Sequence, residues 1–196
     1  LLNALRRVRE LQQRALGVKP PAESSTAPVA LSQMFVVFSP KGGAGCTTVA
    51  TNLAIALQQL LKREVLLVDG KHLLGHVALM LNLRGGNSIT DLLAHAGRLD
   101  ANLIRQVVIR HVSGLNVLPS PVAITKAQGI RPDDLYKVLL GLQSVYPYIV
   151  VDGGNHLDDN LVTYMDAAQH IILVTNPNLA CLRDARQFLD IAQTLS

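Results

Sequence analysis

At residues 39–48 the chain reads Ser39-Pro40-Lys41-Gly42-Gly43-Ala44-Gly45-Cys46-Thr47-Thr48. An apolar run at 34–38 precedes this stretch and a helical pattern at 49–61 follows it, which is the context of a phosphate-binding loop. Glycines reach backbone conformations that are closed to other residues, so successive N–H groups can converge on one anion. The dipole and free N–H groups of the following helix favour the same site. The stretch therefore predicts an anion site, with Thr47 and Thr48 where a hydroxyl could bind Mg²⁺.

One position departs from the P-loop pattern G-x-x-x-x-G-K-[ST], because Cys46 stands where the pattern has lysine. The loop resembles the deviant Walker A motif of the ParA/MinD family, K-G-G-x-G-K-[ST]-[ST]. In that family an additional early lysine reaches across a nucleotide-sandwich dimer to the partner's phosphates, and Lys41 stands at this signature position. Within the family, loss of the ordinary lysine is typical of the CpaE/TadZ branch, which is involved in pilus assembly and polar placement. A glycine-rich turn without a ligand is the alternative.

Composition narrows the class of protein. A chain of 196 residues suits one α/β domain with a little extra, and 49% hydrophobic with 16% charged residues is a globular balance. No apolar run approaches the length of a membrane span, so no transmembrane segment is expected. Cys46 and Cys181 lack metal-ligand spacing, which indicates a reduced cytoplasmic protein without a structural metal. The net charge of +4 is modest and the core has no basic stripe, so nucleic acid is not an expected partner.

The first residues form a separate unit. At 1–17, apolar residues recur at helical spacing with arginines between them. This segment resembles the last helix of a response-regulator receiver domain, which CpaE-like proteins often carry upstream; a basic helix on a membrane surface is the alternative. Three prolines and a Ser-Ser-Thr run at 18–33 predict a flexible linker. The P-loop domain then occupies 34–196.

Continuous apolar runs and helical patterns alternate through this domain. The further runs are at 64–69, 115–119, 148–152 and 170–175, and the helical stretches are at 48–61, 99–110, 133–145, 160–168 and 179–195. Because no run alternates apolar with polar residues, the strands should be covered on both faces, as in a parallel sheet. The pattern predicts an α/β, doubly wound, mostly parallel sheet of P-loop NTPase type, with ligands at the carboxyl ends of the strands. The loop at 39–48, Asp69 and Asp152 all fall at such ends.

Two strand ends carry carboxylates. Asp152 follows an apolar run in the Walker B form, which delivers a carboxylate towards a metal, although such a residue can also cap a turn. In the family a D-x-D pair follows the second strand, and its second member positions the attacking water. Here Asp69 is retained, while Lys71 takes the second place and, when protonated, cannot act as a base. We interpret the neighbouring His72 and His76 as solvated loop residues.

The resemblance extends over residues 35–189. It includes the stretches at 73–79, 88–93, 114–119 and 180–186, of which the last looks like CpaE rather than MinD. The family normally continues with another strand and a loop that holds the adenine. We therefore expect the domain to be incomplete at its C-terminus, with one open sheet edge.

The resemblance implies a CpaE/TadZ-like protein that binds ATP and Mg²⁺ and works as a nucleotide-dependent dimerisation switch in pilus assembly or polar localisation. Hydrolysis should be weak or absent because Cys46 and Lys71 replace groups that support it. The expected catalytic residue is Lys41, the metal ligands are Thr47 and Asp152, and the nucleotide contacts are Lys41, Gly42, Gly43, Ala44, Gly45, Cys46, Thr47, Thr48 and Asp69.

The expected partners are a second copy of the chain, pilus or secretion machinery and the upstream receiver domain. The expected location is the cytoplasm, at a cell pole or at the inner face of the membrane through partners. The alternative function is a signalling or scaffold output module that binds no nucleotide. DNA partitioning is less well supported, and so is a Rossmann dehydrogenase, since the loop lacks G-x-G-x-x-G.

Overall fold

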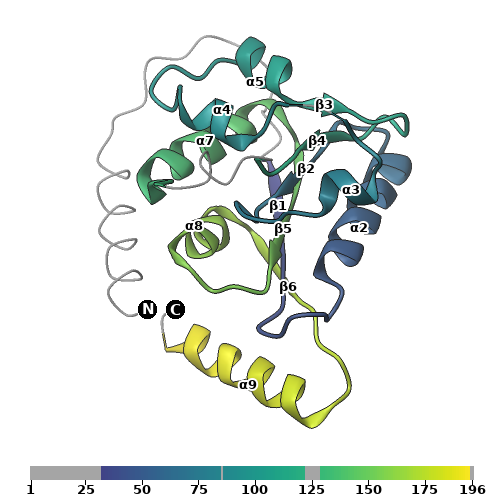
Figure 1. The fold of residues 1–196 in the computed structure, drawn as a ribbon, viewed down its shortest axis with the longest axis vertical. Helices are drawn as coiled ribbons and strands as arrows, with labels where there is room; N and C mark the ends of the chain where they lie inside the picture. The colour runs from purple at the N-terminus through teal and green to yellow at the C-terminus, as the bar shows by residue number, and fades with distance from the viewer. Residues whose placement is uncertain (1–31, 85, 122–128, 195–196) are drawn as a thin grey trace.

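The computed structural model describes residues 32–84, 86–121 and 129–194, and their strands form one six-stranded sheet (Figure 1). The strands are β1 (Gln33–Phe38), β2 (Val65–Asp69), β3 (Ile109–Arg110), β4 (Asn116–Leu118), β5 (Tyr148–Gly154) and β6 (His170–Leu173). The helices of this part of the chain are α2 (Cys46–Leu61), α3 (Val77–Met80), α4 (Ile89–Leu93), α5 (Ala101–Val107), α7 (Pro132–Val145), α8 (Asp159–Ala167) and α9 (Leu179–Gln193).

The sheet has the order β3-β4-β2-β5-β1-β6, and every neighbouring pair is parallel except β3 and β4. This confirms the predicted α/β fold with a mostly parallel sheet. The predicted helix at 99–110 is wrong at its end, because α5 stops at Val107 and Val108 is extended. Ile109 and Arg110 then pair with β4 through a tight turn in which Gly114 has a φ of 86°.

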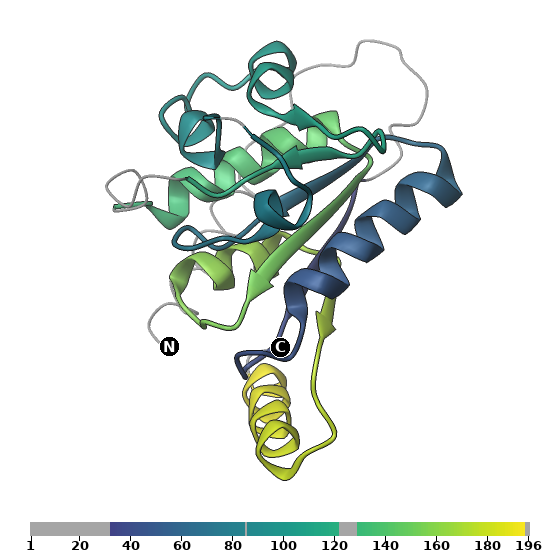
Figure 2. The same cartoon turned by 45° about the vertical axis from the view of Figure 1, so that its right-hand side comes forward.

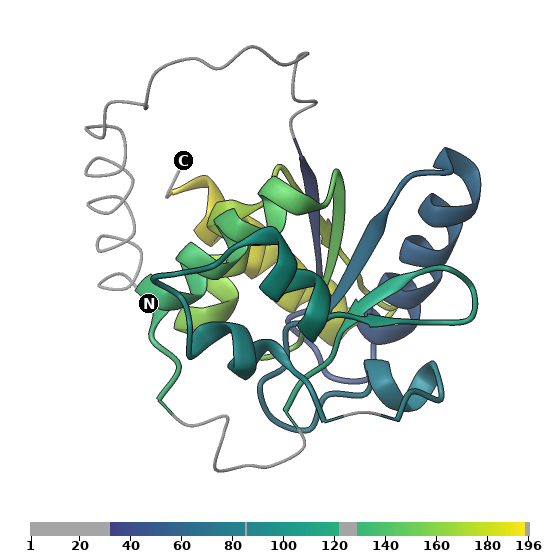
Figure 3. The same cartoon turned by 90° about the horizontal axis from the view of Figure 1, so that it is seen from above.

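Successive side chains of the central strands enter two separate apolar clusters. In β1, Met34, Val36 and Phe38 belong to the cluster beneath α4, α5, α7 and α8, whereas Val37 belongs to the cluster beneath α2 and α3. Figures 2 and 3 show α2 on one side of the sheet and α7 and α8 on the other. Because both faces are covered, both sets of alternating positions are apolar, and the strands are continuous apolar runs.

Strand β6 is an exception to this coverage. Its residues His170 and Ile171 are exposed, so the expectation that every strand is covered on both faces is wrong here. The physical reason is that β6 forms one edge of the described sheet, next to β1. Helix α9 follows it and is only partly covered. Ala185 is buried and the Phe188 ring lies 5.1 Å from that of Phe38, while Leu182 is half exposed.

The predicted helix at 1–17 and most of the predicted linker at 18–33 lie outside the described residues. Gln33, the last residue of the predicted linker, already pairs with Tyr148 of β5 and belongs to β1. Within the described ranges, no helix combines the length and apolar character needed to cross a membrane.

Candidate functional site

The loop between β1 and α2 has the backbone of an anion site. Gly43 and Gly45 have φ values of 81° and 98°, in the left-handed region that glycine enters without strain. Gly45 is the N-cap of α2, and no side chain caps this helix end. The first N–H groups of a helix have no partner within the helix, so those that follow Gly45 are available to a ligand.

A pocket of about 420 Å³ opens at this loop. Its lining residues are Lys41, Gly43, Ala44, Gly45, Cys46, Thr47, Thr48, Lys71, His76, Gly154 and Asn155. Most of the predicted nucleotide contacts are thus brought together, but Gly42 and Asp69 are not among the described residues that form the wall. At Gly42, which is exposed, an added Cβ would be 3.2 Å from the side-chain nitrogen of Asn155.

Thr47, which lines the pocket, contacts Asp152 although the two residues are far apart in the sequence. The Thr47 hydroxyl donates to Asp152 Oδ2 at 2.6 Å, and the N–H of Gly154 donates to Asp152 Oδ1 at 3.3 Å. The Asp152 side chain is completely buried. A buried carboxylate is stable in its charged form only when such donors or a cation stand beside it.

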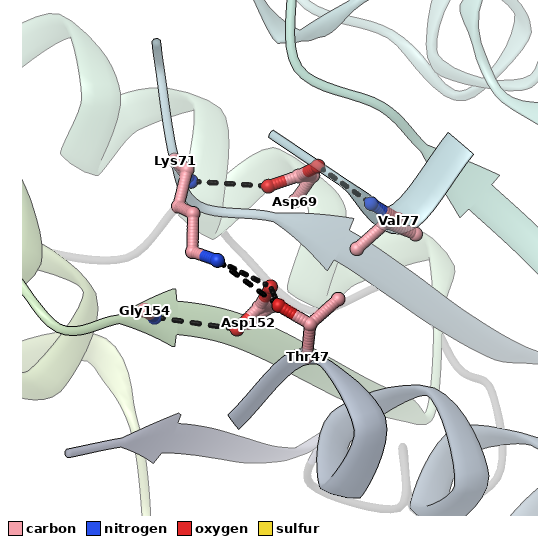
Figure 4. A network of polar contacts seen from close by, with 6 residues as sticks. All are labelled: Thr47, Asp69, Lys71, Val77, Asp152 and Gly154. Carbon is pink, nitrogen blue, oxygen red and sulfur yellow. Dashed lines mark hydrogen bonds and ion pairs between the residues drawn. The ribbon is translucent and has the colours of Figure 1, made fainter. Parts of the chain in front are cut away.

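The cation beside this carboxylate is Lys71 (Figure 4). Its Nζ donates to Thr47 Oγ1 at 3.0 Å and lies 3.5 Å from Asp152 Oδ2. The aliphatic part of Lys71 crosses Gly154, which has a φ of 67°; an added Cβ there would be 3.1 Å from Lys71 Cγ. The turn after β2 therefore delivers a positive charge into the pocket.

The contacts of Lys71 affect whether Thr47 and Asp152 can bind the expected Mg²⁺ ion. In P-loop proteins Mg²⁺ is held between the loop hydroxyl and the Walker B carboxylate, which correspond here to Thr47 and Asp152. The ammonium of Lys71 contacts both of these groups. Mg²⁺ needs oxygen ligands at about 2.1 Å in near-octahedral geometry. With Lys71 in this position, the arrangement of Thr47 and Asp152 does not fit a Mg²⁺ ion.

Asp69 supports the turn that carries Lys71. It is completely buried, and its carboxylate accepts hydrogen bonds from the N–H groups of Lys71 at 3.3 Å and Val77 at 3.1 Å. Burial raises the pKa of Asp69 to about 6. An added Cβ on Gly75 would collide with this carboxylate and with the Ser120 hydroxyl. Asp69 thus fixes the backbone of residues 70–77 rather than facing the pocket.

The two histidines of this turn have different surroundings. His72 is buried and its ring stacks on Tyr164 with centroids 5.9 Å apart, so the interpretation of this residue as solvated is wrong. Burial lowers the pKa of His72, which favours the neutral ring. His76 is exposed and lines the pocket.

Cys46 cannot supply the positive charge of the lysine that the P-loop pattern has at this position. Its side chain is buried in the cluster that includes Val37 and Ala50. Burial, followed by the negative charge of Asp152, raises the pKa of the Cys46 thiol to about 11. A thiol with this pKa is neutral near pH 7, so the positive charges at the pocket come from Lys41 and Lys71.

Sequence reasoning missed Gly154 and Asn155, which both line the pocket. The Gly153-Gly154 pair directly after Asp152 was an available signal, since two glycines at a strand end indicate a close approach of other groups.

A parallel α/β sheet with a glycine-rich loop before a helix, and a hydroxyl–carboxylate pair beneath it, defines the class of P-loop proteins. The family model described as an AAA domain (AAA_31) matches residues 32–196, and the chain belongs to this family.

Solved structures and curated proteins place the chain among ParA/MinD P-loop ATPases. A ParA family ATPase of Chlorobium tepidum is 30% identical with a TM-score of 0.78, over 83% of this chain and 68% of that one. MinD of Pyrococcus horikoshii, solved with Mg-ADP, is 28% identical with a TM-score of 0.71, over 84% and 66%. The curated MinD of Synechocystis is 28% identical over 83% of this chain and 60% of its own length. The chain spans 58–60% of the length of the first three curated proteins that it matches, of which this MinD is one.

Proposed function

We propose that this chain binds ATP with its phosphates at the 39–48 loop. The observation that carries the proposal is the pocket in which Lys41, the left-handed glycines and the uncapped end of α2 face the same space. Each of these favours an anion, and together they suit the phosphates of a nucleotide. The Mg-ADP bound to the homologous MinD of Pyrococcus horikoshii supports a nucleotide as the ligand. Mg²⁺ was the metal expected with it, and the position of Lys71 argues against its binding to Thr47 and Asp152.

Hydrolysis by this site is proposed to be weak or absent. The neutral thiol of Cys46 cannot stabilise charge on the transferring phosphoryl group as a lysine does. Lys71 takes the place at which the family has its water-positioning aspartate, and its ammonium bonds to Thr47. An ammonium cannot accept a proton from the attacking water. The site therefore suits binding better than turnover.

We further propose that ATP binding promotes association of two copies through Lys41, within a CpaE/TadZ-like role in pilus assembly or polar localisation. Lys41 is exposed at the rim of the pocket, where its charge could reach a second molecule. The CpaE-like stretch at 180–186 and the departures at Cys46 and Lys71 support this branch. Its partners would be pilus or secretion proteins. Loss of pili or of polar placement in a deletion strain would support this role, and normal pili with normal placement would contradict it.

The test of binding is a titration with a fluorescent ATP analogue, for the wild type and for Lys41→Ala. We expect the variant to bind at least about tenfold more weakly, because it loses a charge-assisted contact to phosphate. Lys137→Ala is the matched control, since Lys137 is exposed on α7 and pairs with Asp134. Sedimentation velocity with and without ATP measures the association of copies. Absence of binding by the wild type would contradict the proposal and favour a scaffold without nucleotide.

A further inference from the structure

The ammonium of Lys71 contacts both members of the hydroxyl–carboxylate pair, with a hydrogen bond to Thr47 and an ion pair with Asp152. The Nζ atom is 3.0 Å from Thr47 Oγ1 and 3.5 Å from Asp152 Oδ2 (Figure 4). The Thr47 hydroxyl donates its own proton to Asp152, so its oxygen presents lone pairs to the ammonium. A metal ion bound to a P-loop hydroxyl uses the same lone pairs.

The backbone and the stem of Lys71 are both held in place. Its N–H donates to the buried Asp69 carboxylate, which also holds Val77, so both ends of the turn are fixed on one group. The methylene chain lies across Gly154, where the absence of a Cβ leaves room for it. The side chain is 23% exposed and lines the pocket. This ordering reduces the entropy that is lost when the ammonium meets a ligand.

The charges at the base of the pocket balance without an added ion. Asp152 contributes one negative charge and Lys71 one positive charge, within 3.5 Å of each other. A divalent cation placed against Thr47 would be repelled by the ammonium 3.0 Å from the same oxygen. Lys41 and the helix N-terminus then remain to attract phosphate.

We propose that Lys71 is a built-in cation that takes the position of the divalent metal, so that this pocket binds nucleotide phosphates in the absence of Mg²⁺. The proposal rests on the proposed function, since it requires that the pocket bind a nucleotide. It makes Lys71 a residue that determines which form of ATP is bound: the metal-free nucleotide rather than its magnesium complex.

The test is a calorimetric titration of the full chain with ATP, once in Mg²⁺ and once in EDTA, for the wild type and for Lys71→Met. Met keeps an unbranched apolar stem, one atom shorter than the lysine side chain, and removes the charge. We expect the wild type to bind in EDTA at least as tightly as in Mg²⁺. Lys71→Met should bind about tenfold or more weakly in EDTA, because a charge-assisted contact is lost, and should regain affinity when Mg²⁺ is added. Lys137→Met is the matched control and should behave as the wild type.

The outcomes separate the two proposals. Binding by the wild type that requires Mg²⁺ would overturn this inference and leave ATP binding intact, and that result needs no variant. Lys71→Met that binds in EDTA as tightly as the wild type would also overturn it. If the wild type binds ATP in neither buffer, the proposed function is wrong and this inference falls with it.

Discussion

At the scale of single residues, Cys46 and Lys71 determine where the positive charge of the pocket comes from. Cys46 begins α2 with a buried neutral thiol, and Lys71 brings an ammonium from the turn after β2. The two lie close enough for the charge of Lys71 to oppose, in part, the rise in the pKa of Cys46. The pocket therefore keeps a positive charge, but the ammonium that carries it is hydrogen-bonded to Thr47 and paired with Asp152.

Asp69 predicts a pH dependence of stability. Its pKa is about 6 in the folded chain, against an ordinary value of 3.8, chiefly because of burial. Between these values the folded chain holds a proton that the unfolded chain has released, so the free energy of unfolding falls as the pH rises from 4 to 6. The full difference amounts to about 3 kcal/mol. At pH 7 the folded chain is therefore less stable by this amount, and the stability returns when the pH is lowered.

Urea denaturation of the wild type and of Asp69→Asn over this pH range measures the effect. Other carboxyl groups also titrate, including Asp166, whose pKa burial raises to about 6, so the difference between the two proteins is the relevant quantity. The stability of the wild type relative to Asp69→Asn should fall as the pH rises from 4 to 6. Asp133→Asn, which changes a half-exposed carboxylate of α7, should not reproduce this slope. A flat difference for Asp69→Asn would contradict the assigned cause.

At the scale of elements, the conformation of the loop at 39–45 allows us to predict how a methyl group added at Gly45 affects stability and ATP binding. Gly45→Ala would place a Cβ where nothing lies within 4 Å, so its effect comes from the backbone φ of 98° alone. A left-handed conformation costs a residue with a Cβ about 1–2 kcal/mol. We expect this loss in the free energy of unfolding, together with weaker ATP binding as the N–H groups after Gly45 are turned aside.

Gly97→Ala is the matched control for this prediction, because its Cβ would also meet nothing within 4 Å and its φ lies outside the left-handed region. Denaturant unfolding and ATP titration of both variants supply the two readouts. If Gly45→Ala binds and unfolds as Gly97→Ala does, the loop does not depend on the conformation described.

The sequence predicted most strands and the long helices well, but it missed the two-residue strand β3. Apolar runs and helical periodicity located β1, β2, β5 and α7 to within a residue or two at most boundaries. Strand β3 was assigned to a helix because its two residues carry too little periodic signal, and only their pairing with β4 makes them a strand. The exposure of Ile171 was missed because a strand's place at a sheet edge depends on topology rather than on its own residues.

The site was predictable in its outline but not in its contacts. Residue types and spacing predicted that the loop and Asp152 would share one edge of the sheet, since the carboxyl ends of parallel strands meet there. They could not predict the position of the Lys71 ammonium, because a side chain with four rotatable bonds takes its conformation from distant groups. Here those groups are Thr47, Asp152 and Gly154. The burial of His72 depends in the same way on Tyr164 of α8.

At the scale of the whole molecule, the sheet brings together residues that are far apart in the chain. Strand β1 lies between β5 and β6, so the loop after it faces the end of β5 that carries Asp152. Strand β2 lies on the other side of β5, and its end delivers Lys71. The site thus depends on the pairing of three neighbouring parallel strands, β1, β5 and β2.

The most direct test of the central claim, that the 39–48 loop holds the phosphates of a nucleotide, is a nuclear magnetic resonance titration of the ¹⁵N-labelled chain with ATP. We predict that the amide signals of Gly43, Gly45 and Thr47 shift and saturate together, because their N–H groups would donate to phosphate oxygens. Saturable shifts elsewhere with these signals unmoved, or no shifts at any ATP concentration, would contradict the claim.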